Sequence, residues 1–413
     1  TQGVSSAASD VYKRQAQDHY DRSEWPSARG DRDAFVAKFG EARAQRFEQA
    51  FWASDPIADA LFTSGHKSKE IMPNLREALA RGEATDTTLP EVKALIDDMN
   101  AALDGVDWER LERGQQAALA IPVLAQNLSL GPGALIHTYI TPSIANVLVN
   151  TGELTEGAVH RLAYTTNWIY SVYLKDGLKP GNVSFVHTGM VRAMHAHVRR
   201  VQGQLGLDYA EWGRPISEFD MLRTWFDFTY IAFTYLRNLG YRLTVEEEQD
   251  LFYLWKVVGI MLGIPTDLLD NETDIDASQA TIDAIHAVDG EPNDASRALI
   301  DALFSGFRTN VKAMLPFPDE SIDDWMYTAT RLMHGDEIAD QFNVPQPVSR
   351  PFVELDLPLV QQRFDLLRAN PEALEKEVTQ NHQALLDALT QETSYMSQDE
   401  GVKMSDGAYR PGA

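Results

Sequence analysis

The sequence predicts an all-α fold, and three observations indicate it. Apolar residues recur at steps of three and four along most of the chain, which is the period of an amphipathic helix. The alternation of apolar and polar residues that is typical of strands is almost absent. Proline and glycine cluster at few points, chiefly 131–133, 177–181 and 343–351. With 413 residues and 44% hydrophobic content, the chain can bury one large core.

The first helices are predicted from local patterns. Residues 32–52 place apolar side chains from Phe35 to Phe51 at mostly three- and four-residue steps. Residues 86–104 begin with threonines and a proline, a common helix start, and then place apolar side chains on one face. Further helices are predicted at 107–128, 139–150, 155–175, 188–205, 217–239, 244–263, 274–287, 293–314, 319–333 and 356–393.

The domain organisation is expected to be simple. We expect one large helical domain over 30–370 and a terminal helix at 371–394. Residues 1–15 have the composition of a translated adapter and are left out of the fold prediction, and 395–413 are expected to be disordered. The proline-rich segment 343–351 is predicted to be extended.

Composition excludes several classes of function. With 36 Lys and Arg against 61 Asp and Glu, the net charge is −25, so binding to nucleic acid or to anionic headgroups is not expected. The chain has no cysteine, which excludes disulfides and thiolate ligands to zinc, haem or iron–sulfur clusters. No apolar run reaches the ~20 residues of a transmembrane helix, and the longest, 251–264, contains Lys256 and is predicted to be a buried helix.

The stretch HTGMVRAMHAHVRR (187–200) contains the first candidate site. Each residue of a helix advances about 100° around the axis. Measured from Arg192, His195 therefore lies about 60° away and Arg199 about 20° away, so the three side chains share one face. His197 points in roughly the opposite direction, so the two histidines cannot bind one metal ion from a regular helix.

An Arg-His-Arg face on a half-apolar helix has a clear chemical use. Imidazole is the common ligand of haem iron where no thiolate is present, and the two guanidiniums would balance the haem propionates. The alternative is a solvent-exposed polar stripe that pairs with some of the many acidic residues.

A second candidate cluster lies in 157–174. Arg161 and Thr165 are four residues apart and share a face, and Tyr164 lies beside them. A guanidinium, a phenol and a hydroxyl could hydrogen-bond bound dioxygen or a water. The alternative is a set of surface polar residues in the first half of a helix. Asp227, among the aromatic residues of another helix, is interpreted as a hydrogen-bonded core acid in preference to a partner of His195.

Other motifs are absent: the sequence has no paired Glu-x-x-His, His-Glu-x-x-His, Gly-x-Ser-x-Gly or phosphate-binding glycine loop. Three stretches instead carry a family resemblance: NVLVNTGELTEGAVHRLAYTTNW (146–168), VRAMHAHVRR (191–200), and 216–269, which closes with LWKVVGIMLGIP and contains Trp255, Gly259 and Gly263. Taken together, the chain resembles the family that groups the latex-clearing proteins, or rubber oxygenases, with the ER-bound fungal oxygenase of mycophenolic acid biosynthesis.

The resemblance implies a haem-b oxygenase that uses O2 as co-substrate. In the latex-clearing branch it implies a globin-like all-α core in which His195 is the axial ligand to iron and Arg192 and Arg199 flank it. The distal arginine and threonine of that branch correspond to Arg161 and Thr165. The implied substrate is an apolar small molecule or polymer whose C=C bond is cleaved to two carbonyls.

The sequence is closest to the family over 130–270 and departs from it at two positions. Tyr164 stands where the latex-clearing enzymes have a distal lysine. A distal glutamate of that branch would fall near Ala145, and neither Glu153 nor Glu156 is an obvious equivalent. Two alternatives to an oxygenase stay open: a haem carrier or sensor without turnover, and a cofactor-free helical protein in which the Arg-His-Arg face docks an acidic partner or the terminal helix.

Overall fold

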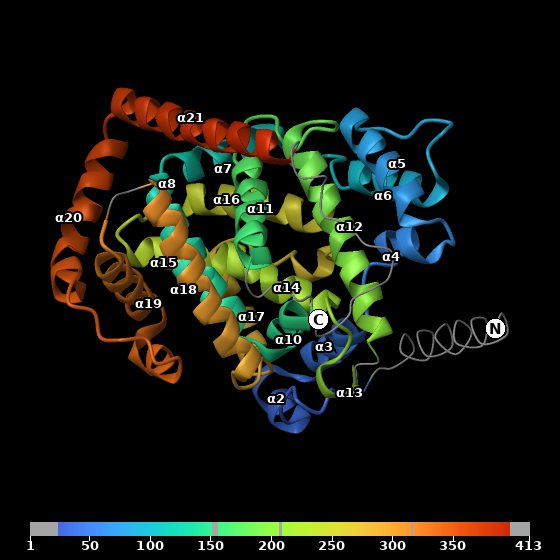
Figure 1. Ribbon diagram of the computed structural model, residues 1–413, viewed down its shortest axis with the longest axis horizontal. Coiled ribbons are helices and arrows are strands. Elements are labelled where there is room, and N and C mark those ends of the chain that lie inside the picture. Colours follow the sequence, from blue (N-terminus) through green and yellow to red (C-terminus); the bar gives the residue numbers. More distant parts are fainter. Residues whose placement is uncertain (1–23, 151–155, 206–208, 315–316, 397–413) are drawn as a thin grey trace.

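A computed structural model describes the backbone of residues 24–150, 156–205, 209–314 and 317–396, with most of the side chains. This part of the chain is helical throughout and contains no strand (Figure 1). The elements, in chain order, are α2 (Arg32–Phe39), α3 (Glu41–Trp52), α4 (Pro56–Thr63), α5 (Ser68–Arg81), α6 (Pro90–Ala101), α7 (Trp108–Leu119), α8 (Val123–Leu128), the π-helix η1 (Ser129–Leu135), α9 (Ile136–Ile140), α10 (Pro142–Asn150), α11 (Glu156–Val172), α12 (Val183–Gln204), α13 (Tyr209–Trp212), α14 (Glu218–Phe226), the π-helix η2 (Asp227–Ile231), α15 (Ala232–Asn238), α16 (Val245–Met261), the 3-10 helix η3 (Thr266–Leu268), α17 (Ile275–His286), α18 (Asp294–Met314), α19 (Asp319–Gln341), α20 (Arg350–Arg368) and α21 (Pro371–Met396).

The predicted fold class, a single all-α domain, is confirmed. One large cluster of buried apolar side chains extends from Phe35 near the start of the described chain to Leu389 in α21. Its centre includes Trp255 of α16, which is 1% exposed. In Figure 1, α21 lies across one edge of the molecule, α2 and α3 lie at the opposite edge, and α20 lies at the end remote from α4, α5 and α6.

Four predicted helices, those over 32–52, 107–128, 139–150 and 356–393, are each divided by a break in the structure. The helix predicted over 32–52 is broken at Gly40, whose φ of 88° is disfavoured for side chains with a Cβ and ends α2 before α3 begins. The helix predicted over 356–393 is broken at Pro371, which has no amide hydrogen and starts α21 as a separate helix. The helices predicted over 107–128 and 139–150 are likewise broken before α8, at Pro122, and before α10, at Pro142. The predicted single helices were therefore wrong at one glycine and three prolines.

The helix predicted over 217–239 contains a different irregularity. It is divided into α14, the π-helix η2 and α15, and η2 packs against η1, the other π-helix of the described chain. A π-helix widens the helical turn by one residue and is frequent at functional sites. Apolar periodicity does not reveal such a change of turn, because the polarity of the residues stays the same.

The terminal helix α21 is packed into the main core. The side chain of Asn381 donates to the carbonyl oxygen of Leu119 at 2.9 Å, and Leu385 is fully buried. The segment 1–15 and residues 397–413 of the tail predicted over 395–413 lie outside the described residues, while 395 and 396 belong to α21.

No single described helix has the length and the apolarity required to cross a membrane. Trp108–Leu119 and Val123–Ile140 meet these criteria only as a pair, and they are bent by 91° relative to each other.

The glycines near the end of α16 permit close packing. A Cβ on Gly263, which has a φ of +87°, would lie 2.6 Å from a carboxylate oxygen of Asp55 and 3.0 Å from Nε of Arg192. A Cβ on Gly259 would lie 3.0 Å from the indole nitrogen of Trp225. The two glycines of LWKVVGIMLGIP therefore leave room for a buried ion pair and for a buried indole.

Gly263→Ala should lower the free energy of unfolding by about 2–4 kcal/mol, because it combines left-handed backbone strain with a clash against the Asp55–Arg192 pair. Gly105→Ala is the matched control, since Gly105 has a φ of +73° and no atom within 4 Å of an added Cβ. It should cost only about 1–2 kcal/mol. Equilibrium unfolding in guanidinium chloride measures both, and equal losses would contradict the proposed crowding.

Candidate functional site

The two helices that carry the predicted site residues, α11 and α12, form an antiparallel pair. The indole nitrogen of Trp168 in α11 donates to Oγ1 of Thr188 in α12 at 3.0 Å. Residue 161 precedes Trp168 by seven positions, and His195 follows Thr188 by seven. In antiparallel helices these two positions lie level with each other along the pair. The side chain of Arg161 itself lies outside the described residues.

The orientation of His195 follows from its neighbours along α12. Thr188, His195 and Gln202 are seven residues apart and form one ridge, because seven residues make almost two turns. Thr188 contacts α11, and Gln202 donates to the carbonyl oxygen of Val147 in α10 at 3.4 Å. His195 lies between them on the ridge that faces α10 and α11.

The imidazole of His195 is suited to bind a metal ion. Its Nδ1 is buried and has no hydrogen-bond partner among the described residues. The pKa of His195 is lowered to about 4, chiefly by burial and also by the positive charge of Arg199, while the carboxylate of Asp55 opposes the shift. The ring is therefore neutral near pH 7 and keeps a nitrogen lone pair for a ligand.

His197 lies in a different environment. Its ring packs edge-on against Phe62 of α4, with 5.2 Å between the ring centroids. Its pKa is also lowered, chiefly by burial. His195 and His197 contact different parts of the protein, as their spacing predicts.

The guanidinium of Arg192 has partners within the protein. Its Nε and Nη2 donate to the two carboxylate oxygens of Asp55 at 2.6 and 3.0 Å, and Nη1 donates to Asp98 at 2.6 Å. Arg192 is 2% exposed, and Asp55 also caps the first turn of α4 through the amide of Ala58. The partners of Arg192 are thus aspartates, whereas the sequence led us to expect cofactor carboxylates.

Arg199 has the same kind of partner. Its Nε donates to Asp59 at 2.7 Å, and Arg214 reaches the other oxygen of that carboxylate at 3.1 Å. Both arginines therefore join α12 to α4, and Arg192 joins it to α6 as well. This clamp, formed by Arg192, Arg199, Asp55, Asp59 and Asp98, fixes the rotation of α12 about its axis and so the direction of His195.

The other predicted residues lie on α11. Tyr164 and Thr165 are partly buried, and Tyr164 packs against the main core. The Tyr164 ring lies 6.4 Å from the ring of His187 in α12, a histidine that the sequence analysis did not single out. Burial lowers the pKa of His187. The only signal for it was its position next to Thr188 in the conspicuous HTGMVRAMHAHVRR stretch.

The position expected for a distal acid is apolar. Ala145 in α10 is fully buried in a small apolar cluster with Ile136 and Leu299. Glu153 and the side chain of Glu156 lie outside the described residues. Position 145 therefore carries a methyl side chain and supplies no carboxylate that could act as that acid.

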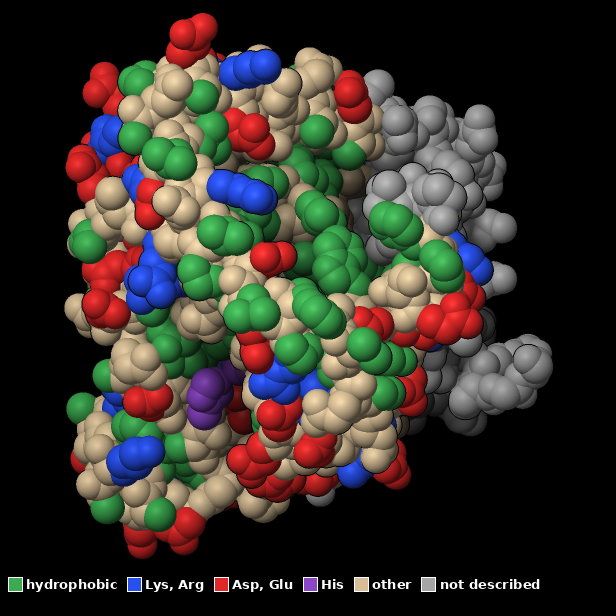
Figure 2. Space-filling view, turned by 90° about the vertical axis from the view of Figure 1, so that its left-hand side faces the viewer, with side chains coloured by type: hydrophobic (Ala, Val, Ile, Leu, Met, Phe, Trp, Pro, Cys, Tyr) green, Lys and Arg blue, Asp and Glu red, His purple; other side chains and the backbone are tan. Residues whose placement is uncertain are grey.

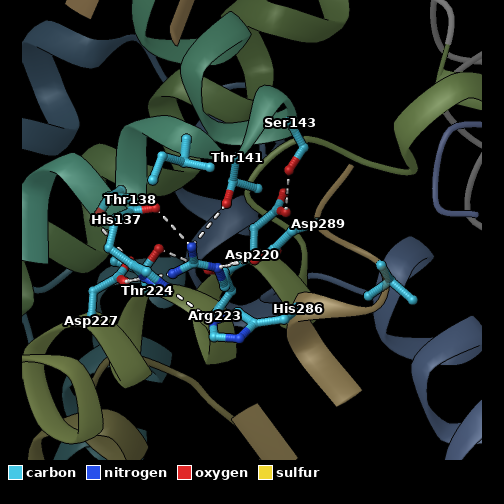
Figure 3. Close-up of polar contacts among 12 residues, drawn as sticks. His137, Thr138, Thr141, Ser143, Asp220, Arg223, Thr224, Asp227, His286 and Asp289 are labelled. Atoms are coloured by element: carbon cyan, nitrogen blue, oxygen red, sulfur yellow. Dashed lines mark hydrogen bonds and ion pairs between the residues drawn. The ribbon is translucent and has the colours of Figure 1, made fainter. Parts of the chain in front are cut away.

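A second buried polar cluster lies where η1, α9 and η2 meet (Figure 3). Asp227, which is 1% exposed, contacts Nδ1 of His137 at 2.7 Å, accepts from Thr138 at 2.7 Å and pairs with Arg223. Arg223 also pairs with Asp289 at 3.0 Å. Asp227 is therefore a hydrogen-bonded core acid, as predicted.

This cluster extends to the surface through a second histidine. Nε2 of His137 lies 2.9 Å from Nε2 of His286, which is exposed at the end of α17. Because the Nδ1 hydrogen of His137 faces a carboxylate, its Nε2 accepts a hydrogen bond from His286. Burial and the charge of Arg223 hold the pKa of His137 well below its usual value, which keeps it neutral. Since 149 residues separate the two histidines, sequence spacing could not reveal the contact.

The described residues hold no group of three or more His, Cys, Asp or Glu side chains arranged for a metal ion. A small cavity of about 10 Å3 lies among α7, α8, η1, α15 and α16, lined by residues that include Gln126, Tyr173 and Phe233. It has room for about one water molecule and is too small for a porphyrin.

Asp227→Ala should lower the free energy of unfolding by about 3–5 kcal/mol, because Arg223 would lose one partner of a fully buried ion pair. Asp267→Ala is the control: Asp267 pairs with Arg46 at 2.6 Å but its side chain is 60% exposed, and its loss should cost about 1 kcal/mol or less. Chemical unfolding of both variants tests the difference, and a small loss for Asp227→Ala would show that the cluster does not brace the core.

Comparisons with known proteins place the chain in a family. Residues 122–362, more than half of the sequence, match the family model described as "ER-bound oxygenase mpaB/B'/Rubber oxygenase, catalytic domain". A solved structure titled "Structure of Latex Clearing Protein LCP in the closed state" has a similar fold, with a TM-score of 0.59 and 21% sequence identity over 80% of this chain and 91% of that one. No protein of curated function matches the sequence. The chain belongs to the family of ER-bound oxygenases of the mpaB type and rubber oxygenases.

Proposed function

We propose that the protein is a haem-b-dependent oxygenase that oxidises an apolar, isoprenoid-like substrate with O2. Membership of the family indicates an oxygenase, and hence an oxidoreductase. The observation that supports haem is His195, a neutral, partly buried imidazole on the side of α12 that faces α10 and α11. Its Nδ1 is buried and has no hydrogen-bond partner among the described residues, a property that Nδ1 of His197 shares. An unsatisfied buried nitrogen costs free energy, and a ligand that organises the site would relieve that cost.

The donor chemistry of the residues on α11 and α12 supports such a group. His195 would hold the iron from α12, and the level position of residue 161 on α11 allows Arg161, Tyr164 and Thr165 to line the opposite side. Haem, when bound, supplies an iron centre that binds and activates dioxygen. Arg161 and Tyr164 would donate hydrogen bonds on that side, and Thr165 would orient them.

Arg192 and Arg199 have a different role in this proposal. Their guanidiniums pair with Asp55, Asp98 and Asp59, so they act as positioning residues for His195 rather than as partners of haem carboxylates. Their charges are balanced inside the protein before a cofactor binds. A clamp of this kind holds the ligand in one orientation and limits the movement of α12 during turnover.

The proposed substrate is apolar and carries a C=C bond. The similar fold belongs to a latex-clearing protein, and the acidic chain disfavours anionic substrates. In the proposed reaction both atoms of O2 are incorporated: the C=C bond is broken and each carbon gains one oxygen as a carbonyl. No additional reductant is then needed for the overall balance.

Hemin titration tests the ligand. The wild-type protein should give a Soret band with one equivalent of hemin, and His195→Ala should lose it or bind at least tenfold more weakly, because the imidazole nitrogen is removed. His197→Ala is the matched control, since His197 lies on the same helix but packs against Phe62. Circular dichroism shows whether each variant is folded. A folded His195→Ala protein with an unchanged spectrum would exclude His195 as the ligand.

Oxygen uptake tests the reaction. With polyisoprene, carotenoid or prenyl-quinone substrates, the haem-loaded protein should consume O2 and form carbonyl products. Arg161→Gln should lower the rate by about 10²–10³ with the Soret band retained, because it removes one donor at the developing charge. A haem-loaded protein that binds O2 without consuming it on any of the substrates would favour a haem carrier or sensor, and failure to bind hemin at all would favour a cofactor-free helical protein.

A further inference from the structure

Helix α20 has an inner face that attaches it to the rest of the protein. Phe364 is 3% exposed and packs edge-on against Tyr241, with 5.3 Å between the ring centroids. The helix backbone also approaches Gly240 closely: a Cβ there would lie 3.0 Å from the carbonyl oxygen of Leu357. One side of α20 is therefore used for packing within the chain.

The outer face of α20 is apolar and exposed. Five large apolar side chains lie on it or at its start: Val348 (78% exposed), Phe352 (67%), Leu355 (75%), Leu359 (48%) and Leu366 (64%). They are half of the ten large apolar side chains that are exposed in the described part of the chain. Figure 1 shows α20 at the outer edge of the molecule, and Figure 2, which views the molecule from that side, shows apolar side chains spread over the surface. Such a concentration on a single helix typically marks an interaction surface.

The spacing of these side chains is that of a coiled-coil seam. The positions along the seam are 348, 352, 355, 359, 362 and 366, so the steps alternate between four and three residues. Position 362, a glutamine, is the one polar member. This alternation is the a/d pattern of a heptad, which gives a narrow stripe that fits one partner helix. Helices that lie flat on a lipid surface carry a wider apolar face with lysines and arginines beside it.

The charge on α20 also favours a second copy. The helix carries three arginines and three acidic residues, so it is neutral in a chain of net charge −25: Arg350, Arg363, Arg368, Glu354, Asp356 and Asp365. Two copies can therefore approach through this helix without the repulsion that the rest of the acidic surface would produce. A neutral helix gives no attraction to anionic lipids.

We propose that the protein forms a two-fold symmetric dimer in which the outer faces of two α20 helices pack antiparallel, centred at Leu357. The seam is symmetric about that position. Val348 would meet Leu366 of the second copy, Phe352 would meet Gln362, and Leu355 would meet Leu359. A two-fold axis requires such a self-complementary surface.

The size of the face agrees with a specific but modest interface. From their exposed fractions, the five side chains offer about 600 Å2 of apolar surface on each copy, or about 1,200 Å2 in all, which is the lower end for specific interfaces. Because the seam lies apart from α11 and α12, this proposal does not depend on the proposed oxygenase function.

Analytical ultracentrifugation of the full chain, over a hundredfold range of protein concentration, tests the dimer. The wild-type protein should change from monomer to dimer with concentration, and Leu355→Asp should weaken the association at least tenfold because it places a charge at the centre of the seam. Val245→Asp is the control, since Val245 is 69% exposed but lies at the start of α16, off the seam. A wild-type protein that stays monomeric, or a dimer unaffected by Leu355→Asp, would overturn the proposal.

Disulfide trapping tests the register, because the chain has no cysteine of its own. Phe352→Cys and Gln362→Cys proteins should cross-link to each other when they are mixed under mild oxidation. Each variant alone should cross-link much less, because in the antiparallel pair residue 352 of one copy lies about 15 Å along the helix axis from residue 352 of the other, and the same holds for residue 362. Cross-linking of each variant with itself would instead show a parallel pair and overturn the antiparallel arrangement.

Vesicle binding tests lipid as the alternative occupant of this face. If the wild-type protein is monomeric and binds neutral phosphatidylcholine vesicles, and if Leu355→Asp abolishes that binding, the face is assigned to lipid and the proposed dimer is overturned.

Discussion

The structure around the candidate site depends on the buried guanidinium of Arg192, which pairs with the buried Asp55 and the partly exposed Asp98. Three elements meet at this guanidinium: α12 supplies the arginine, the start of α4 supplies Asp55, and α6 supplies Asp98. Taking one partner away from such a pair costs about 3–5 kcal/mol, so the three elements are held in a single arrangement. Gly263 belongs to the same constraint, because a larger residue at the end of α16 would displace the carboxylate. The direction in which α12 presents His195 is thus set by ion pairs on the adjoining side of the helix, which faces α4.

The fold class, most helices and the segment that carries the candidate site could be predicted from the sequence. The period of the apolar residues identified the helices. The angular spacing along α12 distinguished His195 from His197: in the structure His195 lies on the ridge that faces α10 and α11, and His197 packs against Phe62. The helix breaks at Gly40, Pro122, Pro142 and Pro371 were missed, since apolar residues continue on both sides of each. The π-helices were missed because a widened turn leaves the composition unchanged.

Partners distant in the sequence could not be predicted. Asp55 lies 137 residues from Arg192, and nothing local to either residue marks them as a pair. The sequence led us to expect cofactor carboxylates beside the two arginines, whereas the structure pairs them with aspartates. The cluster of His137, Asp227 and His286 was missed for the same reason: each residue is a single polar side chain in an apolar segment, and only the tertiary fold brings them together.

The position of the charges explains how so acidic a protein can contain an apolar site. The α12 clamp together with Arg214 contains three arginines and three aspartates, so it adds no net charge beside His195. The imidazole is itself neutral, because burial lowers its pKa to about 4. The surplus of acidic residues therefore lies elsewhere in the chain, where water and salt screen it and where it favours solubility. A neutral interior beside an acidic exterior favours an uncharged ligand over an anion, which is the selectivity that the proposed oxidation of an isoprenoid-like substrate would require.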